Sequence, residues 1–346
     1  MGLDLVTVWS IVLALGLALY VLLDGMYLGI EMLLLSARKS SEREEMIGSL
    51  KPFNIGNAVW LMLCVAGFIV TFPLAGSVFL QAFWLPCLLM LFGFLLRIIA
   101  TKCLSKAPSG HQGPWGFCLG FGSVLATFCQ GALIGAFMQG VLVEDSRFVG
   151  SVWDWLSWFS ALTGITLILT YLVLGATGLL MPPALNKDMK QKMRHYSHHL
   201  LVWFGYAIVA VQLITPFLTD ALRERWLGLP NFFYMGFVPM LGLMAYVWVY
   251  YVIRFSTWKV WPFSVFLIFL GTVYFTLIIS LWPMVLPAEL TIHNAAASES
   301  TLRLALWGSA IALPALMVYL YRSYCVFYKK GSEDNSGRAF KSQALS

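Results

Sequence analysis

Two carboxylates, Asp24 and Glu31, interrupt the first long apolar segment of the chain, and both fall on one face if that segment is helical. A carboxylate at the centre of a membrane helix costs about 2.5–3.5 kcal/mol, so it persists where it faces protein, water or a proton path. Tyr20 and Tyr27 share the face, close enough to the acids for a chain of hydrogen bonds. This spacing predicts either a proton path or charge compensation at Asp24 and Glu31, or else a polar seam that fixes helix pairing.

Other polar residues lie where they could meet these acids. Asn57 and Trp60 begin the next apolar segment, so an amide and an indole N–H enter the membrane there and need partners. Arg97 ends the third segment, where an arginine usually extends to the lipid headgroups. We expect Asn57, Trp60 and Arg97 to orient the acids, with Tyr20 and Tyr27 as hydrogen-bond relays.

The composition predicts a helical membrane protein. Hydrophobic residues make up 60% of the chain, charged residues 11%, and the mean hydropathy is +0.81. Lipid offers the backbone no hydrogen bonds, so long apolar runs must be α-helices. The fold class is therefore all-α and polytopic, with nine predicted spans at about 6–34, 54–75, 78–100, 114–142, 152–181, 199–219, 231–253, 260–286 and 302–327.

The positions of lysine and arginine predict the orientation. All but four of the 22 fall in the hairpins after spans one, three, five and seven or at the C-terminal end, the exceptions being Arg147, Arg223, Arg225 and Arg303. The positive-inside rule then puts the N-terminus outside and the C-terminus in the cytoplasm. The net charge of +6 is explained by topology and by contact with anionic lipid, so no nucleic-acid partner is expected.

Residues 1–330 are expected to form a single transmembrane domain of two four-helix units plus a final helix. Residues 331–346 are polar and serine-rich, which predicts a disordered cytoplasmic tail.

Histidine is missing from the middle of every predicted span. His195, His198 and His199 fall at the entry to the sixth span, and His111 and His293 fall in loops. Buried haem or copper is normally held by imidazole, so we expect this chain to bind no cofactor and no metal by itself.

Several motifs occur in the order and spacing of one family. They are Asp24-Gly25-Met26-Tyr27-Leu28-Gly29, Glu42-Arg43 with Met46-Ile47, Gly56-Asn57-Ala58-Val59-Trp60, Arg97, Gly122-Ser123 with Gln130-Gly131, Trp282-Pro283, Leu290-Thr291-Ile292 and Ala295-Ala296-Ala297. Through them nearly the whole chain resembles subunit II of the cytochrome bd quinol oxidases, with the cyanide-insensitive type as one candidate.

The resemblance implies a heterodimer in the bacterial cytoplasmic (inner) membrane that oxidises membrane quinol and reduces oxygen to water. Subunit I would hold haem b and haem d, and this chain would catalyse nothing alone but would take part in proton uptake.

Two departures from the family pattern bear on that proton uptake. Tyr27 stands where the family usually has a second acid, and Asn54-Ile55 stands where it usually has Trp-Asp. The family associates those acids with proton uptake, so Glu31 would have to replace them.

Two alternatives remain open from the sequence. A secondary transporter would use broken helices and an internal repeat, but no convincing match joins the two halves of the chain. A purely structural subunit without a proton role fits the missing family acids.

Overall fold

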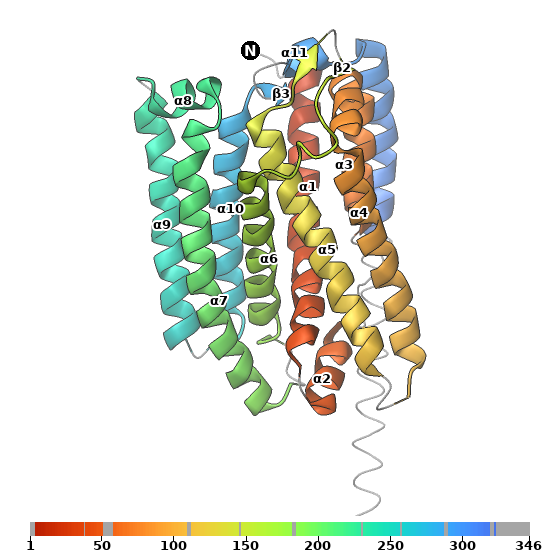
Figure 1. Ribbon diagram of the computed structural model, residues 1–346, viewed down its shortest axis with the longest axis vertical. Coiled ribbons are helices and arrows are strands. Elements are labelled where there is room, and N and C mark those ends of the chain that lie inside the picture. The colour runs from red at the N-terminus through yellow and green to blue at the C-terminus, as the bar shows by residue number, and fades with distance from the viewer. Residues whose placement is uncertain are drawn as a thin grey trace, which may run out of the picture.

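Long helices lying side by side make up most of this computed structural model (Figure 1). The structure describes residues 4–37, 39–50, 58–108, 112–144, 147–181, 185–229, 231–256, 258–286, 290–318 and 322. The elements are α1 (Leu5–Leu33), η1 (Leu34–Ser36), α2 (Ser40–Leu50), α3 (Ala58–Thr71), α4 (Pro73–Lys106), α5 (Gln112–Gln139), β1 (Val143–Glu144), β2 (Arg147–Phe148), α6 (Trp158–Gly178), α7 (Lys187–Ile214), η2 (Thr215–Phe217), α8 (Asp220–Leu227), α9 (Asn231–Phe255), α10 (Trp261–Leu281), β3 (Met284–Leu286), β4 (Leu290–Thr291), α11 (Ile292–Ala295) and a final helix, Glu299–Val318.

The all-α polytopic fold is confirmed, since eight described helices are long and apolar enough to cross a membrane. The ninth predicted span, 54–75, corresponds to α3, which is shorter, and residues 51–57 before it lie outside the described part. The count of nine spans therefore stays a prediction. The predicted tail, 331–346, also lies outside the described residues.

The two ends of the bundle differ in their short elements and charges. The N-terminus, α8, α11 and the β1–β2 hairpin lie at one end, and α2 lies at the other (Figure 1). Three of the four exceptional arginines belong to β2 and α8, and Arg303 begins the final helix beside α11. We call the two ends the N-terminal end and the α2 end. Which end faces the cytoplasm remains a prediction from the positive-inside rule.

Local sequence explains where several helices begin and bend. The Asp4 side chain accepts from the N–H of Thr7 and so caps α1, while Ser157 and Ser160 form a capping box for α6. In α4, Pro86 removes one backbone hydrogen bond, and Phe83 takes a non-helical conformation one turn earlier. α4 is therefore kinked at about its first third.

Helix α1 lies at the centre of the bundle, packed against α3, α5 and α6. The crossing of α1 with α6 depends on Gly29 and Gly175, whose backbones touch, so that a Cβ on Gly175 would lie 2.5 Å from the Gly29 carbonyl carbon. A side chain at either position would force the helices apart. This close approach buries the second half of α1, which carries the two carboxylates.

Candidate functional site

A buried cluster of three charged side chains joins α1 to α4. Arg97 Nε donates to Glu31 Oε2 over 2.6 Å, and its two terminal nitrogens approach Asp24 Oδ2 and Oδ1 at 3.2 and 3.4 Å. The exposed fractions of Asp24, Glu31 and Arg97 are 1%, 0% and 5%. One cation thus faces two carboxylates in a site closed to solvent and lipid.

The helices place these side chains by simple spacing and close packing. Asp24 and Glu31 are seven residues apart, about two turns, so both project from the same face of α1. Arg97 reaches them because α4 lies close to α5, where a Cβ on Gly122 would lie 2.8 Å from the Gly93 oxygen. Arg97 therefore does not extend to the headgroups, and the interpretation of this residue as an interfacial cation is wrong.

Ser123 on α5 completes the cluster, and its hydroxyl can form a hydrogen bond with Glu31 whether Glu31 is ionised or protonated. Its hydroxyl lies 2.5 Å from Glu31 Oε2 and 2.8 Å from the Leu119 carbonyl oxygen. With Glu31 ionised, the hydroxyl proton points to the carboxylate. With Glu31 protonated, the acid donates to Ser123 Oγ while Ser123 donates to Leu119. Both states leave every partner hydrogen-bonded, so the cluster accommodates one additional proton.

A second polar group lies further along α1 toward the N-terminal end. Gln130 Nε2 on α5 donates to the Tyr20 hydroxyl over 2.8 Å, and Tyr171 on α6 donates to Gln130 Oε1 over 3.4 Å. All three side chains are buried. Gly25 leaves room for the Tyr171 ring, which a Cβ there would meet at 2.7 Å. Polar groups thus follow α1 from residue 20 to residue 31, about 16 Å of helix.

The remaining sequence-predicted residues are placed differently. Tyr27 is buried in an apolar cluster that also contains Ile30 and Leu33. Trp60 packs beside Tyr20, and its indole nitrogen has no hydrogen-bond partner among the described residues, so it does not meet the carboxylates. Asn57 lies outside the described part of the chain. Of the seven predicted site residues, the structure brings together Asp24, Glu31 and Arg97, with Tyr20 one turn from Asp24.

Three contributors to the site were not predicted as site residues. Ser123 and Gln130 are polar residues within a glycine-rich predicted membrane span. A polar side chain at that position is the signal that could have identified them as site residues. Tyr171 stands in an apolar run with nothing to distinguish it from a packing residue. Only the α1–α6 crossing shows that its hydroxyl meets Gln130.

The described histidines lie away from these clusters. His195, His198 and His199 are in the first half of α7, near the α2 end, and His293 is in α11. Within the described ranges, no group of three or more histidine, cysteine or acidic side chains could hold a metal ion. Among the described residues, the polar contacts of the buried site are charge pairs and hydrogen bonds.

Known proteins are similar to this chain over most of its length. The family model for cytochrome bd terminal oxidase subunit II matches residues 5–327. The chain is 22% identical to cytochrome bd-I ubiquinol oxidase subunit 2 of Escherichia coli, over 92% of each chain. It is also 22% identical to cytochrome bd ubiquinol oxidase subunit 2 of Bacillus subtilis, over 94% of this chain and 96% of that one.

A solved structure shares the fold. A chain of the bd oxidase from Geobacillus thermodenitrificans superposes with a TM-score of 0.77 at 14% identity, covering 93% of this chain and 98% of that chain.

Proposed function

The chain belongs to the cytochrome bd terminal oxidase subunit II family, and from that premise we propose that its buried Arg97 cluster binds and releases a proton for a bd-type quinol oxidase. The chain is the second subunit of such a complex and a multi-pass protein of the bacterial inner membrane. The relatives are named as ubiquinol oxidases, so the substrate proposed for the complex is a membrane quinol, and lipid surrounds it.

We assign the haems, b and d, to the partner subunit. Haem supplies the oxygen-reducing chemistry, and its iron is normally held by side chains such as histidine. The described histidines of this chain lie in the first half of α7 and in α11, away from the buried polar clusters, which supports that assignment. The chain then contributes packing and proton binding and is not catalytic alone.

The observation that carries the proton role is the charge balance of the cluster. With both acids ionised it holds two negative charges and one positive charge, and one bound proton makes it neutral. Because an uncompensated charge in a low-dielectric site is costly, a proton is favoured whenever the cluster carries excess negative charge. Ser123 supplies the hydrogen bond that each state needs. We propose Glu31 as the proton-binding group and Asp24 as the permanent partner of Arg97.

Replacing either acid by its amide is expected to slow turnover while the complex still assembles. In Asp24→Asn or Glu31→Gln one carboxylate remains to pair Arg97, so the cluster becomes neutral without an exchangeable proton. We expect oxygen consumption to fall by about tenfold or more in each variant. The double variant is less informative, since it would leave Arg97 buried without a carboxylate.

The complex would be purified through a tag on this chain, and its subunits and visible haem spectrum recorded before turnover is measured. Glu299→Gln is the matched control, because Glu299 pairs with Arg303 on the surface, where both side chains are largely exposed. Normal turnover with normal haem content in both single variants would leave a purely structural subunit as the correct interpretation.

A further inference from the structure

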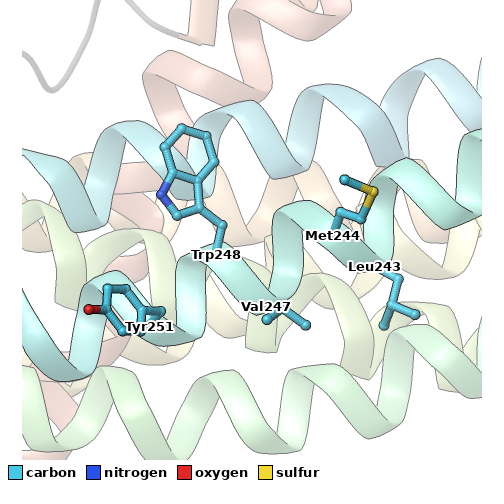
Figure 2. Close-up of a pocket in the computed structure, with 5 residues that line it drawn as sticks. All are labelled: Leu243, Met244, Val247, Trp248 and Tyr251. Atoms are coloured by element: carbon cyan, nitrogen blue, oxygen red, sulfur yellow. The ribbon is translucent and has the colours of Figure 1, made fainter.

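An apolar groove runs along the outer face of α9. Figure 2 shows its five lining side chains, which project from successive turns of the helix: Leu243, Met244, Val247, Trp248 and Tyr251. The groove is shallow and open, with lining residues from α9 alone, and Leu243, Val247 and Tyr251 are each about 60% exposed. A groove of this kind on a membrane-spanning helix faces the hydrocarbon chains of lipid.

A cluster of basic side chains lies just beyond the α2 end of this groove. Arg194 on α7 donates to the carbonyl oxygen of Ser256 over 2.6 Å and so ties α7 to the end of α9. Lys190, one turn before Arg194, lies within electrostatic range of Lys259, and Arg254 lies within range of His198. We call the four cationic residues the α7–α9 basic cluster: Lys190, Arg194, Arg254 and Lys259.

The positive charge of the cluster is not compensated by the described part of the chain. The ion pairs in that part involve none of its members. Two nearby carboxylates are engaged elsewhere, since Glu42 pairs with Lys192 and Glu45 accepts from Asn186. Asp188 stands at the exposed first turn of α7. An anion of another molecule would therefore gain from binding here.

Aromatic side chains connect the groove to the cluster. Tyr251 is one turn from Arg254, and the Trp248 ring contacts that of Trp261, which in turn contacts Trp258. Tryptophan and tyrosine favour the level of the headgroups in a bilayer. The level of these rings therefore separates Leu243, Met244 and Val247, on the acyl-chain side, from the basic cluster, on the phosphate side.

We propose that the α7–α9 basic cluster and the α9 groove together bind one anionic phospholipid. The cluster takes the phosphate and the groove takes an acyl chain. Charge complementarity and the adjoining apolar face of α9 favour this occupant, since basic pockets on one side of a helix bundle select anionic headgroups. A free phosphate shares the headgroup chemistry but has nothing to place in the groove.

The proposal is tested on the intact complex in nanodiscs that contain equal parts of tetraoleoyl cardiolipin and dioleoyl phosphatidylcholine. After extraction into detergent, native mass spectrometry measures the phospholipid retained. We expect cardiolipin to be retained over phosphatidylcholine, and Lys190→Gln with Lys259→Gln to weaken that retention by about tenfold or more. The control is Lys102→Gln with Lys106→Gln, which removes two positive charges at the end of α4 and is expected to change nothing.

Two further experiments test the groove separately from the basic cluster and distinguish a lipid headgroup from free phosphate. Val247→Trp fills the groove and is expected to lower cardiolipin retention, whereas Leu213→Trp on the exposed face of α7 is not. Excess inorganic phosphate is expected to leave the bound lipid in place. Equal retention of phosphatidylcholine, displacement by phosphate, or full retention in Lys190→Gln with Lys259→Gln would overturn the proposal.

Discussion

Replacing Arg97 by glutamine is expected to prevent stable assembly of the complex. Asp24 and Glu31 would then lie buried without a cation, and breaking a buried ion pair in this way typically costs about 3–5 kcal/mol. A cost of that size is a large share of the stability of a protein domain. The measurement is the amount of complex in the membrane and its thermal midpoint after extraction, compared with the unchanged chain.

Two further variants separate charge from packing in this prediction. Arg303→Gln removes an arginine from an exposed pair with Glu299, so its effect on stability is expected to stay below about 1 kcal/mol. Adding Asp24→Asn and Glu31→Gln to Arg97→Gln removes the stranded charges, and we expect it to recover much of the lost complex. Normal assembly of Arg97→Gln alone would show that the cluster does not stabilise the α1–α4 contact.

Replacing Gly29 by alanine is expected to displace α1 from α6. The added Cβ would overlap the carbonyl oxygen of Tyr171, and a backbone atom cannot move aside as a flexible side chain can. Overpacking of this kind costs about 1–3 kcal/mol. Separation of the helices would also disturb the contact of Tyr171 with Gln130. We therefore expect a lower thermal midpoint and slower oxygen consumption together.

The matched control is Gly271→Ala in α10, where nothing lies within 4 Å of the added carbon. Alanine favours helix over glycine by about 1 kcal/mol, so this variant is expected to be neutral or slightly stabilising. Equal effects of the two changes would mean that the α1–α6 crossing does not depend on the small size of Gly29.

Much of the fold follows from hydropathy, because hydrocarbon permits few structures. The composition and the long apolar runs were sufficient to predict the helical membrane fold, and the family motifs agreed with the comparisons. Boundaries were less accurate where polar residues form helix. α7 begins at Lys187, about three turns before the predicted sixth span, because its first turns are basic and hydropathy does not detect them.

The acids of the site were predictable, but their partners were only partly so. The helical spacing of Asp24 and Glu31 and their position inside an apolar span identify both acids from the sequence of α1 alone. The pairing with Arg97 depends on how closely α4 packs against α5, which brings the Arg97 side chain to α1 and which the sequence of α4 does not state. Tyr27 shares the helical face of the acids, yet it is buried in an apolar cluster. The neighbouring helices decide which side chains on one face of α1 meet the acids, so the place of Tyr27 could be learned only from the structure.

Redox-induced infrared difference spectroscopy of the purified complex can detect a proton that binds to and leaves Glu31. If Glu31 binds and releases a proton during turnover, the unchanged complex will show a protonated-carboxyl band that shifts in heavy water. The same band will be absent from Glu31→Gln and present in the control Glu299→Gln. A spectrum that is the same in Glu31→Gln as in the unchanged complex would contradict a proton-binding role for the Arg97 cluster.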